Sequence, residues 1–246
     1  MSSTTTTTTE KLGTALVTGA TSGIGRATAL RLAQDGWTVI VHGRNAERGR
    51  DVVAEIEAAG GRARFVGADL ASMDDVRRLA EESGAIDVLV NNAGTSWFGP
   101  TADLGEAEFE SLFDGNVRST YFLVAALAPA MAERGRGSII NVGSMAGTIG
   151  LAGGAAYGAT KAAMASLARS WAAEYSPQGV RVNAISPGPV FSQEGSALIE
   201  GLGKTTILGR GAHVDEIADV IAFLASDKAS YITGSVIAAD GGRTAI

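Results

Sequence analysis

Residues 14–34 read TALVTGATSGIGRATALRLAQ. The run 14–18 has the length and composition of a short strand, and from Ile24 to Gln34 the apolar residues recur at helical spacing. The turn between them holds glycines in the spacing G-x-x-x-G-x-G. Such a turn lets the backbone approach a pyrophosphate closely, and the free N–H groups at the helix start favour negative charge. The segment therefore predicts a phosphate-binding strand–turn–helix unit, with an ordinary strand–helix turn as the alternative.

The same alternation of short apolar runs and helical periods continues along the chain. Runs of strand length stand at 14–18, 38–42, 62–68, 87–91, 138–142, 180–185 and 235–239. Segments of helical period stand at 24–34, 46–59, 73–82, 107–133, 157–175 and 214–225. Because the strand runs are nearly all apolar, we expect both faces of the sheet to be covered. The pattern predicts an α/β protein with a single-domain Rossmann fold, a doubly wound seven-stranded parallel sheet with helices on both faces.

Composition excludes several classes of function. The 246 residues include no cysteine and two histidines, which rules out disulfides and cysteine-ligated zinc, and we expect no metal site. A net charge of −6 argues against nucleic acid as a partner. The longest apolar run, 121–132, is shorter than the ~20 residues of a spanning helix, so we expect no membrane partner. The Thr-rich segment 1–11 has no features of an export signal, and we expect a flexible tail, a domain at 12–246 and a cytoplasmic location.

Two further turns fall at the carboxyl edge of the predicted sheet, where ligands bind in open α/β folds. Asp69 follows the third strand and can accept a hydrogen bond from an adenine amino group, although a helix-entry aspartate is the alternative. The fourth strand ends in NNAG, residues 91–94, whose small residues leave room for a ribose. An ordinary Asn/Gly turn is the alternative there.

The candidate catalytic residues also lie near this edge. Tyr157 and Lys161 are four residues apart, so a helix places both on one face, as it also does for many solvent-exposed pairs. Ser144 follows the fifth strand. Asn116 lies inside a predicted helix that we expect to bend near Gly115 and Pro129.

Together these motifs resemble the short-chain dehydrogenase/reductase family, and within it the 3-oxoacyl-carrier-protein reductase-like branch. The elements that stand in the family's order and spacing are TGxxxGxG at 18–25, NNAG at 91–94, Asn116, Ser144, YxxxK at 157–161 and PG at 187–188. YITG at 231–234 and DGG at 240–242 also look like that family. The resemblance runs from about residue 12 to 242.

The resemblance implies an NAD(P)-dependent oxidoreductase that transfers a hydride between nicotinamide and a small-molecule ketone or secondary alcohol. Tyr157 would act as general acid and base, and Lys161 would lower its pKa and hold the ribose. Ser144 would stabilise the substrate oxygen, and Asn116 would complete a proton relay through water. The implied cofactor site contains Tyr157 and Lys161 together with Gly19, Thr21, Ser22, Gly23, Ile24, Gly25, Arg44, Asn45, Asp69, Leu70, Asn92, Ala93, Gly94, Pro187, Gly188, Val190 and Ser192.

The end of the second predicted strand bears on the choice of cofactor. Gly43 stands where NAD-dependent relatives carry Asp, and Arg44 follows it. A guanidinium suits a 2′-phosphate, so the missing acid and the added base favour NADP(H) over NAD(H). A solvated arginine at a helix entry is the alternative. Thr21 and Ser22 depart from this pattern, since many NADP-dependent relatives have a basic residue there.

The segments after the strands contain apolar residues that could form the wall of a substrate pocket. The apolar candidates, which could equally pack a lid, are Trp97, Phe98, Met145, Leu151, Phe191, Leu198, Ile199 and Leu202. An α/β-hydrolase is rejected because Val142 stands where its GxSxG elbow would need glycine before Ser144. A non-catalytic dinucleotide-binding sensor is the alternative function.

The predicted helices 107–133 and 157–175 are relevant to the oligomeric state. They carry Ala-rich faces and apolar residues that we expect to be exposed, among them Phe113, Leu123, Met164, Leu167 and Trp171. The resemblance implies that these helices pair across a two-fold axis in a homotetramer. The alternative is that the apolar stripes face the sheet.

Overall fold

Seven strands pair in parallel to form the central sheet, in the order β3-β2-β1-β4-β5-β6-β9. The computed structural model describes residues 12–192 and 196–246, so the predicted tail at 1–11 lies outside the described residues. The strands are β1 (Thr14–Val17), β2 (Thr38–Gly43), β3 (Arg62–Gly67), β4 (Val88–Asn91), β5 (Gly137–Val142), β6 (Val180–Pro187) and β9 (Val236–Ala239). The predicted seven-stranded parallel sheet of a single Rossmann-like domain is confirmed.

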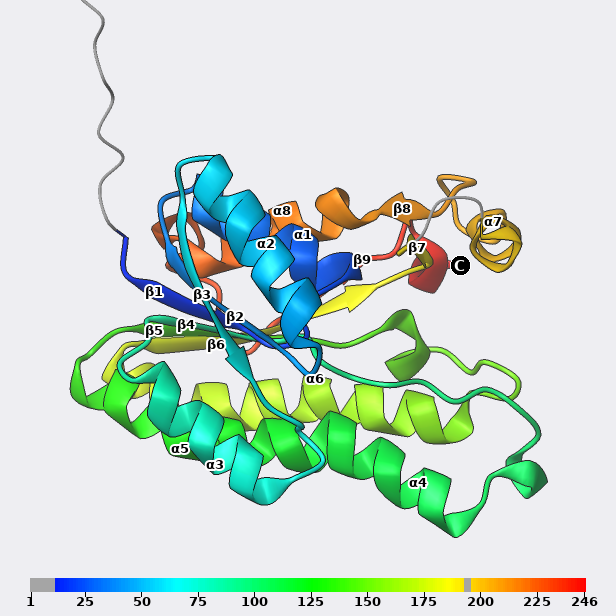
Figure 1. The fold of residues 1–246 in the computed structure, drawn as a ribbon. Helices are drawn as coiled ribbons and strands as arrows, with labels where there is room; N and C mark the ends of the chain where they lie inside the picture. Colours follow the sequence, from blue (N-terminus) through cyan, green and yellow to red (C-terminus); the bar gives the residue numbers. More distant parts are fainter. Residues whose placement is uncertain (1–11, 193–195) are drawn as a thin grey trace, which may run out of the picture.

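Helices cover both faces of the sheet (Figure 1). One layer consists of α1 (Gly23–Gln34), α2 (Ala46–Ala58) and α8 (Val214–Ala225). The other consists of α3 (Met73–Ser83), α4 (Glu106–Phe113), α5 (Ser119–Glu133) and α6 (Ala155–Tyr175). This double winding explains why the strand sequences are apolar at nearly every position. No helix in the described part of the chain is both long enough and apolar enough for a membrane span.

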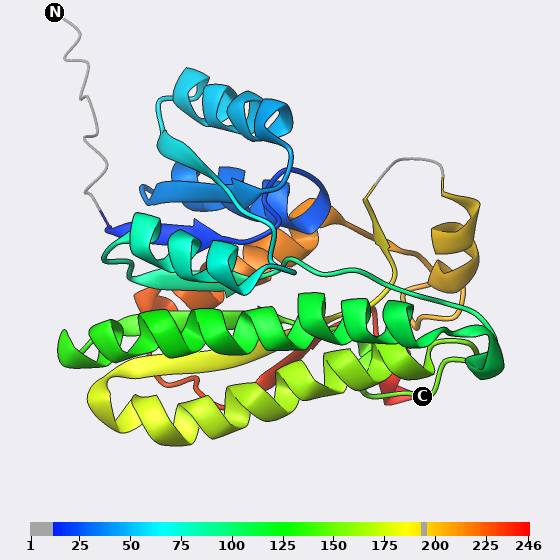
Figure 2. The same ribbon diagram turned by 60° about the horizontal axis from the view of Figure 1, so that its bottom comes forward.

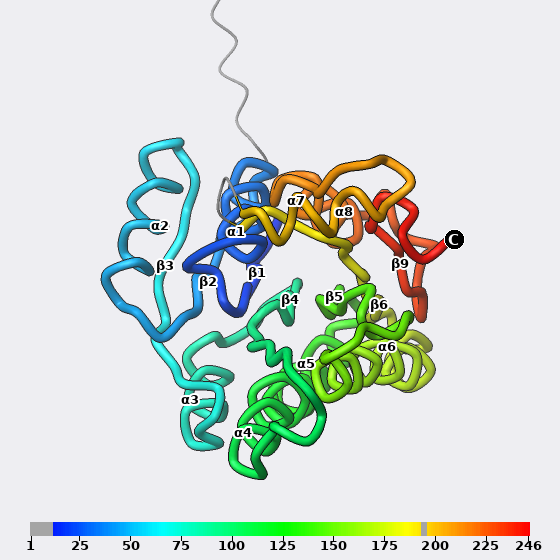
Figure 3. Tube along the Cα trace, turned by 90° about the vertical axis from the view of Figure 1, so that its right-hand side faces the viewer, coloured from blue at the N-terminus to red at the C-terminus, as the bar shows by residue number. Residues whose placement is uncertain are grey.

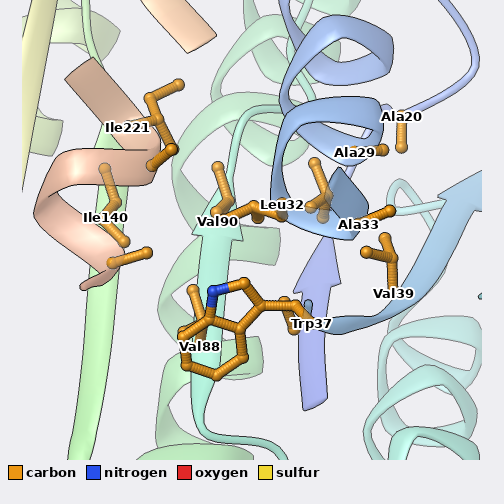
Figure 4. Packing of buried hydrophobic residues seen from close by; sticks show 14 of the residues in the cluster. Ala20, Ala29, Leu32, Ala33, Trp37, Val39, Val88, Val90, Ile140 and Ile221 are labelled. Carbon is orange, nitrogen blue, oxygen red and sulfur yellow. The ribbon is translucent and has the colours of Figure 1, made fainter. Parts of the chain in front are cut away.

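The strand period of two residues divides the core into two halves. Ala15 and Val17 of β1 point into the cluster beneath α1 and α8, whereas Leu16 between them points into the cluster beneath α3, α5 and α6. Figure 4 shows the first cluster, in which Trp37 and Ile221 from opposite ends of the chain lie in one apolar layer. Burial of both faces fixes the register of the sheet and, with it, which loops leave its carboxyl edge.

The carboxyl edge carries structure that the sequence pattern did not predict. Two short strands, β7 (Val190–Phe191) and β8 (Ala212–His213), pair there, and α7 (Ala197–Gly203) lies between them in the sequence. Figure 3 looks onto this edge, with β1 and β4 next to each other. The strand order reverses between β1 and β4, which is where open α/β sheets bind ligands.

The predicted helix 107–133 is two helices joined by one π-helical turn, 114–118. A π-turn thus stands at Gly115, where a bend was expected, whereas α5 continues through Pro129 as one α-helix. The Ser119 hydroxyl donates to the Gly115 carbonyl at 2.7 Å within the same segment. π-turns inside helices occur frequently at functional sites, and this one contains Asn116.

Helices α5 and α6 lie side by side in Figure 2. Their apolar residues face inward more than the sequence suggested. Leu123, Met164 and Trp171 are buried within the single chain, so the expectation that they are exposed is wrong. They are buried because both helices pack their stripes on the sheet, as the alternative held. Tyr121 and Phe122 on α5 are instead about half exposed.

Candidate active site

Two connected cavities follow the carboxyl edge of the sheet. The first, of about 440 Å³, extends from the end of β2 past the phosphate loop. The second, of about 850 Å³, lies over the ends of β5 and β6. Six residues line both cavities: Ile24, Asn92, Gly94, Thr95, Val190 and Ser192. The pair therefore forms one continuous groove across the β1–β4 switch point.

The phosphate loop between β1 and α1 has the geometry of an anion site. A Cβ on Gly19 would lie 2.9 Å from the Ala93 backbone, and one on Gly25 would lie 2.2 Å from the Gly19 carbonyl oxygen. Neither position can hold a side chain. Among the described residues no side chain caps α1, and its first turn has no acid. The free N–H groups at this helix start are thus available to a pyrophosphate.

Thr18, which the sequence analysis did not single out, ties this loop to the NNAG turn. Its hydroxyl accepts from the backbone N–H groups of Asn92 at 2.9 Å and Ala93 at 3.0 Å. The Asn92 side chain donates to the Thr18 carbonyl at 2.9 Å. The Asn92 amide therefore holds loop backbone and leaves the small Ala93 and Gly94 facing the groove.

His42, also missed as a site residue, joins the phosphate loop to the loop after β3. Its Nδ1 accepts from Gly19 N–H at 3.2 Å, so its proton is on Nε2, which lies 3.2 Å from the Ala68 carbonyl oxygen. Burial lowers the pKa of His42 to about 4. The neutral ring thus fixes the backbone on both sides of the first cavity. The only sequence signal was a histidine, rare in this chain, at a strand end.

The cofactor-preference residues meet at one end of the groove. A Cβ on Gly43 would lie 2.5 Å from the Thr21 methyl carbon, so an acidic side chain does not fit unless Thr21 moves. Arg44 lines the same cavity and is exposed. Within residues 12–192 and 196–246 no carboxylate forms an ion pair with it.

Most of the predicted cofactor residues line the groove. Besides Tyr157 and Lys161 these are Gly19, Thr21, Ser22, Ile24, Gly25, Arg44, Asp69, Leu70, Asn92, Ala93, Gly94, Pro187, Gly188, Val190 and Ser192. Two do not line it. Asn45 caps α2, where its side chain accepts from Arg48 N–H at 3.0 Å. Gly23 supplies a left-handed turn residue with φ of 53° at the start of α1. Both contribute to the loop conformation rather than to the groove wall.

Tyr157 and Ser144 meet in the second cavity. Tyr157 lies in the first turn of α6. Ser144 lies two residues after the end of β5 and caps a short 3₁₀ turn by accepting from Ala146 N–H at 3.2 Å. Burial raises the pKa of Tyr157, and a hydrogen bond to Ser144 opposes this rise. The phenol is therefore neutral at pH 7 and can donate a proton.

Lys161 lies one helical turn further along α6. Its ammonium is buried and donates to the Val142 carbonyl at 3.0 Å, and it lies 5.7 Å from the centre of the Tyr157 ring. Burial lowers the pKa of Lys161 to about 8. In the protein without cofactor, burial has the largest effect on the Tyr157 pKa. The lowering by Lys161 and an oxidised nicotinamide stays a prediction.

Asn116 has its side-chain amide fully engaged within the protein. Oδ1 accepts from Thr95 N–H at 2.8 Å, and Nδ2 donates to the Thr95 carbonyl at 2.9 Å and to the Thr160 hydroxyl at 3.0 Å. Thr160 is the neighbour of Lys161 on α6. Asn116 therefore connects the π-turn to the loop that lines the cavity and to the helix that carries the reactive pair. The part of Asn116 in a proton relay stays a prediction.

The apolar candidates divide into two groups. Those that line the second cavity are Phe98, Met145, Leu151, Leu198, Ile199 and Leu202. Trp97 and Phe191 do not line it. The Trp97 ring folds over Gly99, and Phe191 packs on Gly211 beside His213. Sequence alone could not separate these groups, because all eight lie in loops or short elements after strands.

The groove fits a nicotinamide dinucleotide. Its first cavity offers an uncapped helix start and glycines that exclude side chains, as a pyrophosphate requires. Its second cavity places a buried lysine, a tyrosine and a serine at the far end. A phosphate-bearing moiety and a reacting group would thus lie at opposite ends of one site.

Comparison with known proteins agrees with this geometry. A family model described as enoyl-(acyl carrier protein) reductase matches residues 19–244. A 3-oxoacyl-[acyl-carrier-protein] reductase of Staphylococcus aureus is 38% identical over 237 residues, which cover 93% of this chain and 96% of that protein. A 3β-hydroxysteroid dehydrogenase of Mediterraneibacter gnavus is 38% identical over 259 residues, which cover 93% of this chain and 94% of that protein.

Solved structures of similar proteins also include short-chain dehydrogenases/reductases. A short chain dehydrogenase/reductase family protein is 48% identical with a TM-score of 0.90, covering 96% of this chain and 99% of that chain. A blue fluorescent protein from a metagenomic library, solved in complex with NADPH, is 34% identical with a TM-score of 0.88, covering 95% and 98%. The chain therefore belongs to the short-chain dehydrogenase/reductase family of NAD(P)-dependent oxidoreductases, which act on alcohol and ketone groups.

Proposed function

We propose that this enzyme interconverts a ketone and a secondary alcohol, with NADP(H) preferred over NAD(H). The observation that carries the proposal is the convergence of Ser144, Tyr157 and Lys161 on one end of a groove whose other end suits a dinucleotide phosphate. A non-catalytic nucleotide sensor would have no need of this set.

Each side chain has a separate task in the proposed reaction. A bound reduced nicotinamide supplies the hydride. Tyr157 donates its phenolic proton to the substrate oxygen, which its raised pKa permits at neutral pH. Ser144 donates a hydrogen bond to the same oxygen as negative charge develops there. Lys161 holds the ribose hydroxyls and, as a cation, favours the phenolate that Tyr157 becomes.

Asn116 acts by holding the other groups in place. Its amide fixes the loop at Thr95 and the helix at Thr160, so the cavity wall and the Tyr157–Lys161 pair keep their spacing. A water-mediated proton path past Lys161 to solvent, as the family resemblance implies, is compatible with this role. Its backbone carbonyl accepts from Thr120 at 3.1 Å.

The preference for NADP(H) is supported by the end of β2. The Thr21 methyl occupies the space that an acid at position 43 would need, so position 43 carries no carboxylate that would repel a 2′-phosphate. The exposed Arg44 guanidinium lies at the same cavity and can bind the phosphate through two N–H groups. Asp69, Leu70 and Ala71 close this end of the cavity around the expected adenine.

We also infer a homotetramer. The support is the family resemblance together with half-exposed aromatic side chains on the helices expected to pair, namely Phe109, Tyr121 and Phe122. Light scattering at micromolar concentration tests this inference, and a particle of 25.0 kDa, the mass of one chain, would overturn it. The cytoplasmic location stays a prediction from the sequence.

The decisive experiment is an activity panel of ketones and secondary alcohols followed by the absorbance of reduced nicotinamide. We expect oxidation of NADPH with at least one ketone, and slower oxidation of NADH. Tight binding of NADPH without turnover of any panel member would favour the sensor instead.

A further inference from the structure

The substrate end of the second cavity has no counter-ion for an anionic substrate. In the part of the chain that the structure describes, its wall contains no Asp, Glu, Arg or His, and its charged or titratable members are Tyr157 and Lys161. The Lys161 ammonium is buried and bound to the Val142 carbonyl oxygen. A carboxylate or phosphate on the substrate would therefore lose water there without gaining a partner, which is costly.

An aromatic wall stands beside the reacting hydroxyl. The Phe98 ring lies 5.3 Å from the Tyr157 ring, tilted by 53°, yet it remains 57% exposed. Its loop is fixed by a 3.0 Å hydrogen bond from Gly99 N–H to the Gly153 carbonyl. Phe98 thus offers a preformed apolar surface beside the ring that carries the reacting hydroxyl. Phe98 lines this cavity together with Leu198, and a contiguous exposed apolar surface of this kind can mark a ligand-binding groove.

The opposite wall is also apolar. Leu198 on α7 lines the cavity while 71% exposed, and Ile199 and Leu202 follow it on the same short helix. Exposed leucine at the rim of a cavity is stabilised when an apolar ligand covers it.

From these walls we infer that the substrate is an uncharged carbonyl compound with an aromatic or alicyclic body beside the carbonyl. Phe98 and Leu198 set this specificity, and keto acids and phosphorylated ketones are poor substrates. The inference rests on the proposed ketone–alcohol activity and narrows it to a substrate class.

The test compares three aryl ketones with NADPH as the cofactor: acetophenone, methyl 4-acetylbenzoate and 4-acetylbenzoate. The ester and the carboxylate have nearly the same size and shape but differ in charge. We expect kcat/KM to be about tenfold or more lower for the carboxylate than for the ester, because the unpaired charge loses its hydration.

Two substitutions connect this difference to named residues. Leu198→Arg places a cation at the exposed rim and is expected to raise kcat/KM for the carboxylate about two- to fivefold without raising that for the ester. Leu198→Gln is the matched uncharged control and should not favour the carboxylate. Phe98→Ala is expected to raise KM for all three aryl ketones about three- to tenfold while NADPH affinity is unchanged.

The outcomes are distinguishable from those that test the proposed function. Equal or faster turnover of the carboxylate would overturn the substrate class while ketone reduction stands. Turnover of small keto acids but of no aryl ketone would overturn it as well. NADPH binding with no turnover of any ketone or alcohol would instead refute the proposed function, and the substrate class with it.

Discussion

The side-chain amide of Asn116 pairs with the backbone of Thr95 through two hydrogen bonds, one from Thr95 N–H at 2.8 Å and one to the Thr95 carbonyl at 2.9 Å. The side-chain amide thus makes the same pair of hydrogen bonds that a backbone residue makes with its partner in an antiparallel sheet. It holds the loop after β4 against the π-turn, and a third bond reaches Thr160 beside Lys161. The irregular turn in the long helix thereby determines where the cavity wall lies.

Asn116→Ala is expected to lower the free energy of unfolding by about 1–3 kcal/mol, because the polar groups of Thr95 and Thr160 lose their partner. Turnover should fall as well, since Thr95 lines the cavity. Urea unfolding measures the first effect. Thr120→Val, which removes one hydroxyl from the next helical turn, is the control and should cost less. Unchanged stability in Asn116→Ala would contradict this positioning role.

Tyr157→Phe should reduce kcat by a factor of ~10²–10⁴, because it removes the proposed general acid. The ring stays in place against Phe98, so NADPH affinity should be unchanged. Tyr121→Phe, at an exposed tyrosine on α5, is the matched control. Retention of more than about a tenth of the wild-type turnover, with chemistry rate-limiting, would refute the assigned acid.

Ser144→Ala is expected to cost a similar factor in kcat, since it removes a donor to the developing oxyanion. The double variant with Tyr157→Phe should lose little more than the worse single variant, because both groups act on the same oxygen. Steady-state kinetics of the four proteins measures the coupling. Fully additive losses would mean that the two hydroxyls act in separate steps.

Lys161→Met is expected to stabilise the protein at pH 7 while weakening NADPH binding and turnover. The folded pKa of about 8 lies below the 10.5 of an ordinary lysine, so the unfolded chain holds more protons between these values. Stability of the wild type therefore rises with pH from 8 to 10.5. The variant should gain about 1–3 kcal/mol at pH 7, and this gain should shrink as the pH approaches 10.5 in urea unfolding. A less stable variant at pH 7 would contradict it.

Arg44→Ala should weaken NADPH binding about ten- to a hundredfold, the value of a charge-assisted hydrogen bond, and leave NADH binding nearly unchanged. Binding is measured by titration of reduced-nicotinamide fluorescence. Arg50→Ala, an exposed arginine on α2 that does not line the groove, is the control. Equal losses for both cofactors would assign Arg44 a structural role.

Acid should destabilise the wild type through His42. Its folded pKa of about 4 lies below the ordinary 6.5, so its contribution is fully present above pH 6.5 and is lost as the pH falls toward 4. The loss amounts to about 3 kcal/mol. His42→Asn, which keeps an acceptor for Gly19 N–H and cannot become charged, should show a flatter stability profile over this range. His213→Asn is the control and should retain the wild-type slope.

The sequence alone was sufficient to predict the helices and strands and the edge of the sheet at which the candidate site residues lie. Strand and helix periods are local properties, so β1 to β6 and their helices were predicted to within a few residues. Parallel strands send their carboxyl ends to one edge, so Ser144 and the NNAG turn could be assigned to the same site before any contact was known. The spacing of Tyr157 and Lys161 on one helix face is equally local.

The tertiary structure decided what depends on residues far apart in the chain. The His42 ring bridges Gly19 and Ala68, and Thr18 holds the turn after β4. Both contacts depend on which strands lie next to each other in the sheet. The residue period of a single strand does not determine that order. The sequence also could not decide what the apolar stripes of α5 and α6 pack against. Leu123 and Trp171 are apolar whether they face the sheet or a partner chain. Long-range backbone contacts, here between Gly99 and Gly153, likewise settle that Phe98 and not Trp97 lines the second cavity, because neighbouring loop residues carry no periodicity that fixes their direction.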